Sequence, residues 1–223
     1  MPEQEMRIPV GDDAVSGLLN APLHARACYV VAHGAGVGMR HKFMADVAHG
    51  LEARGIATLR YQFLYMEKGG KRPDPPARAH AAVRAAVAKA TELLPKMPLI
   101  AGGKSFGARM TSQAQTEAPL PNVHGLAFLG FPLHPPGQPG HERAEHLSAV
   151  KIPMLFLQGT RDEFADLGHL KPLIKHLGKR ATLKLFDDAD HSFHVPAKSG
   201  RKDSDVMTEM LDTLTEWIGK TIA

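Results

Sequence analysis

The stretch that decides the fold is Leu99-Ile100-Ala101-Gly102-Gly103-Lys104-Ser105-Phe106-Gly107-Ala108-Arg109-Met110. An apolar run leads into a G-x-S-x-G pattern centred on Ser105, and a helix-compatible segment follows. This order is typical of a nucleophile elbow, a sharp turn that exposes a serine at the edge of a sheet. The serine is strained there by about 1–3 kcal/mol, and flanking glycines avoid Cβ collisions where strand and helix nearly touch. We therefore take Ser105 as a candidate nucleophile.

The composition limits the class of protein. A chain of 223 residues, 43% of them hydrophobic, predicts a single domain over residues 1–223. The one cysteine, Cys28, lies in an apolar run, so we interpret it as a buried strand residue rather than a catalytic thiol. A lone cysteine excludes an internal disulfide framework, and Met1–Arg7 is too polar for a signal peptide. We expect a cytoplasmic protein with no membrane partner, because apolar runs fall short of the roughly 20 residues of a membrane span.

The net charge of +4 raises the question of a nucleic-acid partner. The basic residues are scattered, and their densest group, Lys68, Lys71 and Arg72, carries no interleaved aromatic residues. We interpret this group as a solvated loop, with a phosphate-binding patch as the alternative, and expect no nucleic-acid partner. The histidines show no metal-ligand spacing, so the sequence predicts neither a metal site nor a cofactor.

Apolar runs and helical periodicity alternate along the chain. A turn signal at Gly11-Asp12-Asp13 predicts a hairpin over residues 6–19. Strands are expected at residues 27–32, 56–61, 125–130, 154–158 and 182–186, and in the apolar run that leads into Ser105. Helices are expected at residues 42–54, 78–94, after Ser105, at 164–177 and from a cap at Asp203 or Ser204, with a loop at 63–76. This order predicts an α/β fold, a mostly parallel sheet with helices on both faces and its site at the carboxyl ends of the strands.

An acid is expected downstream of the serine. Because the chain has 21 glycines, a G-x-S-x-G pattern needs such support. Asp162 directly follows an apolar strand and therefore lies at the same rim of the sheet as Ser105; a turn aspartate or helix N-cap is the alternative. Asp187, Asp188 and Asp190 lie too close to His191 in sequence to face its far ring nitrogen, so we interpret them as turn formers.

A histidine is expected after the acid, as the base. His191 follows the last strand, which places it at the rim, and His194 is the alternative three residues later. The order Ser105, Asp162, His191 is the one that this architecture requires. The base must reach the serine hydroxyl, and the aspartate must hold the base in one tautomer.

Two backbone N–H groups are expected to form an oxyanion hole. One belongs to Phe106, which follows the serine, and the other to Ala35, in the loop after the first parallel strand. Gly34 and Gly36 allow that loop to present its N–H groups, and His33 is interpreted as a packed loop anchor. Lys104 is expected either to influence the charge preference for substrate or to pack beside the sheet. Arg109, one helical turn after the serine, is expected to pair with an unidentified buried carboxylate.

Five runs of sequence resemble a known family. They are 32–36 (AHGAG), 59–67 (LRYQFLYME), 102–110 (GGKSFGARM), 130–137 (GFPLHPPG) and 157–162 (LQGTRD). Together they resemble the α/β-hydrolase superfamily, in a compact dienelactone-hydrolase-like branch, over roughly residues 6–220. Dienelactone hydrolase itself has a cysteine nucleophile where this chain has Ser105, so its particular substrate is not implied. Eukaryotic relatives serve as subunits of chromatin complexes, so the resemblance also implies that the fold can act as a binding module.

The predicted function is that of a serine hydrolase of carboxylesterase type, which cleaves ester or thioester bonds through an acyl-enzyme. A hydrolase-like scaffold with little activity is the alternative, and acyl transfer, peptidase or haloperoxidase-type activity is a third. Residues 131–150 are too few for a large cap domain, so an open cleft is expected. It would admit a small ester or the end of a polymer. Substrate contacts are expected from Gly34, Gly36, Met39, Phe63 and Tyr65, in a monomer or homodimer.

Overall fold

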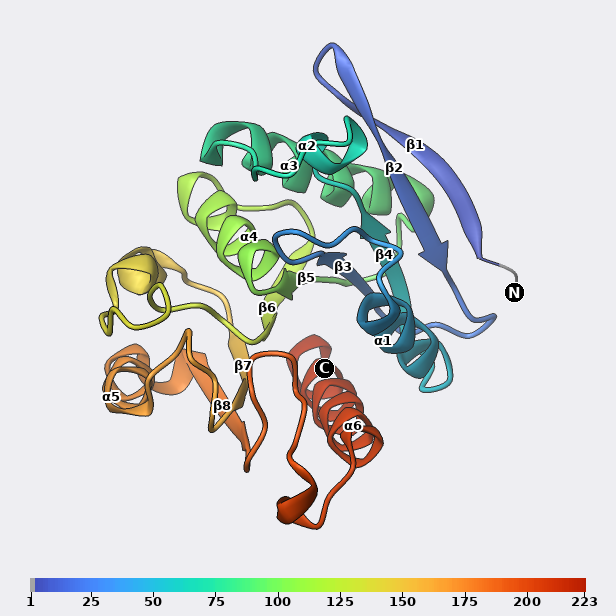
Figure 1. The fold of residues 1–223 in the computed structure, drawn as a ribbon. Helices are drawn as coiled ribbons and strands as arrows, with labels where there is room; N and C mark the ends of the chain where they lie inside the picture. The colour runs from blue at the N-terminus through green and yellow to red at the C-terminus, as the bar shows by residue number, and fades with distance from the viewer. Residues whose placement is uncertain (1–2) are drawn as a thin grey trace.

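A sheet of eight strands runs through the molecule (Figure 1), in the order β1-β2-β4-β3-β5-β6-β7-β8. The computed structural model describes residues 3–223. Met1 and Pro2, part of the segment that argued against a signal peptide, lie outside the described residues. The strands are β1 (Gln4–Val10), β2 (Asp13–Asn20), β3 (Cys28–Ala32), β4 (Ala57–Tyr61), β5 (Leu99–Lys104), β6 (Val123–Leu129), β7 (Met154–Gly159) and β8 (Ala181–Phe186).

The sheet is parallel from β4 to β8, as predicted from the alternation of strands and helices. Strand β2 pairs antiparallel with both β1 and β4, so the expected N-terminal hairpin extends one edge of the sheet. The parallel strands end at a common rim, and β5 lies near the middle with β3 and β6 as neighbours. The turn after β5 is therefore surrounded by the loops that follow those two strands.

Helices cover both faces of the sheet (Figure 1). They are α1 (Lys42–Glu52), α2 (Leu64–Glu67), α3 (Pro76–Leu93), α4 (Phe106–Glu117), α5 (Leu167–Leu177) and α6 (Asp203–Ile222). Side chains of α3, α4 and α5 join one buried apolar cluster, and those of α1 and α6 join the other. The two clusters are the two layers of core that the predicted architecture requires.

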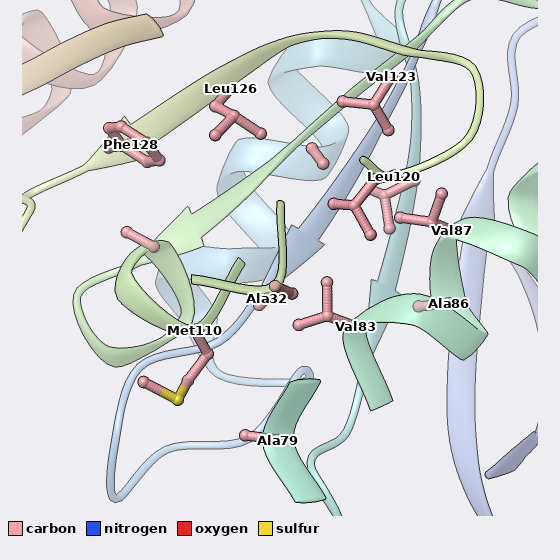
Figure 2. Packing of buried hydrophobic residues seen from close by; sticks show 14 of the residues in the cluster. Ala32, Ala79, Val83, Ala86, Val87, Met110, Leu120, Val123, Leu126 and Phe128 are labelled. Atoms are coloured by element: carbon pink, nitrogen blue, oxygen red, sulfur yellow. The ribbon is translucent and has the colours of Figure 1, made fainter. Parts of the chain in front are cut away.

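Strand β6 shows how one strand serves both layers. Leu126 and Phe128 belong to the cluster on the α3 and α4 side, whereas Ala127 and Leu129 belong to the cluster on the α1 and α6 side. This division follows from the two-residue period of a strand, whose successive side chains point to opposite faces. Figure 2 shows Leu126 and Phe128 on the same side as the α3 and α4 residues that pack there. The continuous run of apolar residues in β6 thus reflects burial of the strand on both faces.

Two predictions of local structure were wrong. The segment 63–76, expected to be a loop, contains α2, whose Tyr65 N–H donates to Asp74 at 2.9 Å. The first turn of the C-terminal helix is capped at Lys202 rather than at Asp203 or Ser204, and the Asp205 carboxylate accepts from the Lys202 N–H at 2.9 Å. Tertiary or reciprocal hydrogen bonds stabilise both features, and such bonds leave no periodic trace in the sequence.

Two helix boundaries also differ from expectation. Helix α3 begins at Pro76, two residues early, because proline fits the first helical position, where no N–H partner is needed. Helix α5 begins at Leu167, three residues late, because the Asp166 carboxylate caps it by accepting from the Gly168 N–H at 2.8 Å. Residues 131–150 hold only the 3₁₀ helix Glu142–Ala149, in agreement with the expected lack of a large cap domain.

Substitution of Phe128 by alanine is expected to lower the free energy of unfolding by about 3–5 kcal/mol, as for other buried phenylalanines. The Phe128 ring is fully buried, 5.1 Å from the Phe131 ring and 4.9 Å from the Phe156 ring, so truncation leaves a cavity. Urea unfolding measures the change. Leu23→Ala is the control, because that side chain is 77% exposed. Equal losses in the two variants would contradict this view of the core.

Candidate active site

Ser105 is the single residue between β5 and α4, and its backbone is strained. Its backbone angles are φ 51° and ψ −111°, a region that residues with a side chain seldom occupy. A Cβ at Gly103 would lie 2.5 Å from the Ala32 carbonyl oxygen, and one at Gly107 would lie 2.7 Å from the same atom. The two glycines therefore allow β5 and α4 to approach β3 closely, and this approach turns Ser105 outward.

Three side chains that are distant in sequence form one chain of hydrogen bonds. The Ser105 Oγ lies 2.8 Å from His191 Nε2, and His191 Nδ1 lies 2.7 Å from Asp162 Oδ2. The Asp162 side chain is 0% exposed, and it also accepts hydrogen bonds from the Gln158 amide and, at 2.8 Å, from the Phe164 N–H. With Nδ1 donating to the carboxylate, Nε2 is free to accept the serine proton. The expected acid, base and nucleophile are thus brought into hydrogen-bonding distance.

The alternative acids and base lie elsewhere. His194 Nδ1 pairs with the Asp203 carboxylate at 2.9 Å, and both side chains are exposed. The Asp203 carboxylate raises the pKa of His194. Asp190 accepts from the Ser192 N–H at 2.7 Å and from the His194 N–H at 3.0 Å, which makes it the turn former that its position predicted.

The loop after β3 brings two expected residues toward the serine. Gly34 and Ala35 line a cavity together with Ser105. As the first residue of α4, Phe106 has a backbone N–H that the helix cannot satisfy. His33 anchors the loop from below: its Nδ1 lies 2.8 Å from the Gly34 carbonyl oxygen, and its Nε2 accepts from the Phe63 N–H at 3.1 Å. Burial lowers the pKa of His33 to about 4, so the ring is neutral at pH 7.

A cavity of about 380 Å³ opens beside Ser105 and His191. The remaining lining residues are mainly apolar or aromatic: Val37, His41, Phe43, Met44 and Phe164, with Lys104 and Ser192. Most of these residues were not predicted as site residues, because six of them lie in loops or at the start of α1, where periodicity assigns no function. The one available signal is their position after the ends of β3 and β7, at the rim of the sheet.

Of the five expected substrate contacts, four are not among the residues that line this cavity. Phe63 is fully buried and packs against Phe106 with ring centroids 5.1 Å apart. Met39 is also buried, and its backbone N–H donates to Gln62 at 2.9 Å. Tyr65 is mostly buried and accepts from the Gly36 N–H at 3.3 Å through its hydroxyl oxygen. The apolar surfaces of these side chains are buried beneath the rim of the sheet. Of the five expected contacts, Gly34 lies on the cavity wall.

Arg109 also differs from expectation. Within residues 3–223 its guanidinium has no carboxylate partner, and its Nε is buried without a hydrogen bond. Burial lowers the pKa of Arg109, and the nearby Arg143 lowers it further. The predicted ion pair of Arg109 was therefore wrong, because α4 turns this side chain toward a basic neighbour.

Other candidate groups contribute little to the site. Cys28 is fully buried in β3, and burial raises the pKa of its thiol to about 12. In the basic loop, Lys68 pairs with Asp13 at 2.7 Å. Among residues 3–223, no group of three or more His, Cys, Asp or Glu side chains is arranged to hold a metal ion. No helix in that same part of the chain has the length and apolarity needed to cross a membrane.

The close approach at the turn predicts a specific sensitivity to one methyl group. Gly107→Ala is expected to lower the free energy of unfolding by about 1–3 kcal/mol, as overpacking does in tight sites, because its Cβ would meet Ala32 at 2.7 Å. Gly219→Ala in α6 is the control, since no atom lies within 4 Å of its Cβ position. Chemical denaturation compares the two, and a stable Gly107→Ala variant would refute the steric argument.

Comparison with known proteins places the chain in a family. Residues 25–219 match the family described as alpha/beta hydrolase domain. A serine hydrolase homologue from Coxiella burnetii has a TM-score of 0.78 at 19% identity, covering 96% of this chain and 98% of that one. A dienelactone hydrolase from Anabaena variabilis has a TM-score of 0.77 at 21% identity, covering 99% of each chain. An α/β serine hydrolase without a lid from Xanthomonas campestris has a TM-score of 0.76 at 19% identity, covering 96% and 94%.

At these identities the solved structures establish likeness of fold, and the family match establishes membership. The matched residues include the turn at Ser105 and both loops that carry Asp162 and His191. The short segment before β7 is consistent with the fold of the Xanthomonas campestris hydrolase, which is described as lacking a lid. The chain therefore belongs to the alpha/beta hydrolase domain family.

Proposed function

We propose that this protein is a serine hydrolase of carboxylesterase type that cleaves ester or thioester bonds through an acyl-enzyme on Ser105. The observation that carries the proposal is the continuous hydrogen-bond chain from Ser105 through His191 to Asp162, at the wall of a cavity. A serine hydroxyl is a weak nucleophile unless a base accepts its proton, and this chain supplies the base and the group that orients it.

The residues present would perform the two half-reactions in turn. The Ser105 oxygen attacks the carbonyl carbon while His191 Nε2 takes the hydroxyl proton, and the buried Asp162 stabilises the imidazolium that forms. The tetrahedral oxyanion would accept hydrogen bonds from the N–H groups of Ala35 and Phe106, each worth about 10²–10³ in rate. His191 then returns the proton to the leaving alcohol or thiol. Water, activated by the same imidazole, hydrolyses the acyl-enzyme.

The cavity supports a small or slender acyl group. Its volume is about 380 Å³, and Val37, Phe43 and Met44 present apolar surface to it. Such walls favour binding of a hydrocarbon or aromatic acyl chain. The absence of a large cap leaves room for an extended alcohol portion, which is consistent with a small ester or a polymer end. We propose that Gly34 contacts the acyl group, with Gly36, Met39, Phe63 and Tyr65 supporting the walls.

Removal of the nucleophile is the first test. Ser105→Ala is expected to lower turnover of p-nitrophenyl acetate by up to about 10⁶, as for other triad nucleophiles. A fluorophosphonate probe should form an adduct on Ser105 of the wild-type protein, located by peptide mass spectrometry. Near-normal esterase activity in Ser105→Ala would refute the proposal. A folded wild-type protein without an adduct would indicate a scaffold.

The two histidines of the loop after β8 provide a matched second test. His191→Ala is expected to lose nearly all activity, because no other base lies within hydrogen-bonding distance of Ser105 among the described residues. His194→Ala, which removes only an exposed pair with Asp203, should keep activity near the wild-type level. Steady-state kinetics with one ester at pH 8 compares them. If His194→Ala proved the inactive variant, the assignment of the base would be wrong.

A further inference from the structure

Lys104 occupies an unusual place for a lysine. It is the last residue of β5, next to Ser105 in sequence, and only 9% of the residue is exposed. Its Nζ donates a hydrogen bond to the backbone carbonyl oxygen of His191. The same atom lies 5.5 Å from the centre of the Phe193 ring and 6.0 Å from that of Phe43. A buried ammonium held in this way is retained only where its charge is matched nearby.

The matching charges belong to the loops of the site. Asp162, after β7, and Asp190, after β8, lie beyond ion-pair distance of the Lys104 Nζ, yet their negative charges favour the ammonium and act to raise the pKa of Lys104. The other titratable groups on the same cavity wall are His191 and His41. Gly130, directly after β6, leaves room for the Lys104 and His191 side chains. A Cβ at this position would lie 3.0 Å from the Lys104 Nζ and 3.5 Å from the His191 ring. The amine, the imidazole and the buried carboxylate thus share one small volume.

The charge balance around Asp162, in the state in which His191 is neutral, suggests a role for the Lys104 ammonium. While the imidazole is neutral, the buried Asp162 carboxylate has no charged partner in His191, and an isolated buried charge is costly. A cation nearby would balance the carboxylate and leave His191 free of its proton. Without that cation, the carboxylate would draw a proton to the imidazole, because an opposite charge favours the charged form of a titratable group.

We propose that Lys104 is a positioning residue, which holds the His191 loop by its backbone carbonyl and acts as the counter-ion of Asp162 while the imidazole is neutral. The inference rests on the proposed hydrolase function, because it acts through His191. The burial of Lys104 and the hydrogen bond from its Nζ to the loop carbonyl favour this role over direct recognition of a charged substrate.

The proposal has a pH signature. Loss of a positive charge near the imidazole should favour its protonated form, so the acidic limb of the kcat/KM profile should move to higher pH. In the wild-type protein burial lowers the pKa of Lys104 to about 8. The wild-type protein therefore loses the same charge above that pH. The activity difference between the wild-type and a neutral variant should then be largest below pH 8 and narrow above it, whereas a packing role would give a loss independent of pH.

The test compares Lys104→Met with Lys184→Met. Lys184 is a matched control on β8, since its Nζ also lies near an aromatic ring, 5.8 Å from the centre of Phe186, and pairs with a carboxylate, Glu209, away from the cavity. For p-nitrophenyl acetate at pH 7, Lys104→Met should lose about 10- to 100-fold in kcat, the scale expected when a catalytic group is misplaced. Lys184→Met should keep its activity.

Four readouts decide the outcome. A shifted acidic limb of the kcat/KM profile with nearly unchanged KM supports the proposal, because it reports the loss of a charge near His191. A pH-independent loss with a lower melting temperature indicates packing alone and overturns it. A rise in KM confined to a succinyl ester indicates a substrate contact and also overturns it. Unchanged activity in Lys104→Met overturns it as well.

A chemical rescue separates the amine from the shape of the side chain. Lys104→Cys can be alkylated with 2-bromoethylamine to restore an amine at nearly the same length. The native thiol, Cys28, is fully buried and its pKa is raised to about 12, so it should not react. Mass spectrometry measures the extent of modification. Recovery of kcat and of the wild-type pH profile in the modified fraction supports the proposal, and a modified protein that stays inactive overturns it.

The order of experiments keeps this inference distinct from the proposed function. Fluorophosphonate labelling of wild-type Ser105 comes first and reports only on the hydrolase proposal. If the wild-type protein labels and turns over esters while Lys104→Met behaves like Lys184→Met, the role of Lys104 fails and the hydrolase remains. If the wild-type protein neither labels nor turns over esters, the hydrolase proposal itself has failed.

Discussion

The close approach of α4 and β5 to β3 is the constraint on which the site depends. Glycines at 103 and 107 leave no Cβ between these backbones, and any larger residue would collide with Ala32. The chain must therefore reverse direction within one residue, and Ser105 adopts a positive φ as a result. The packing of two layers of helix on the sheet maintains that strain. The position of Ser105 is thus a property of the whole core rather than of the turn alone.

A second constraint is the charge of Asp162, buried at the end of β7. Its oxygens accept hydrogen bonds from Gln158, Phe164 and His191, so the carboxylate is fixed in position. Burial without hydrogen bonds would cost several kcal/mol, and the loops after β7 and β8 are shaped by the need to avoid that cost. Lys104 belongs to the same network, because it reaches the His191 carbonyl from the adjacent strand. The strained backbone of Ser105 and the buried carboxylate of Asp162 are both held by contacts at the same rim of the sheet.

The departures from expectation have a common cause. Phe63, Met39 and Tyr65 lie near the rim in sequence, yet their apolar surfaces are buried under the loop after β3. Helix α2 forms because Asp74 and Ser16 supply partners from other parts of the chain. Arg109 faces a basic neighbour rather than a carboxylate. In each case the deciding partner is remote in sequence, and local periodicity carries no information about it.

The sequence by itself determined the α/β architecture, the order of the parallel strands and helices, the turn at Ser105 and the identities of the aspartate and histidine that join it. These features follow from local rules: the period of apolar residues, the glycines around the serine, and the fact that parallel strands end at one rim. Only the tertiary structure decided which side chains line the cavity and which residues cap the helices. It also decided that Lys104 reaches the His191 carbonyl. Those outcomes depend on distances between separate loops, which packing and buried charge set together and which no single stretch of the chain encodes.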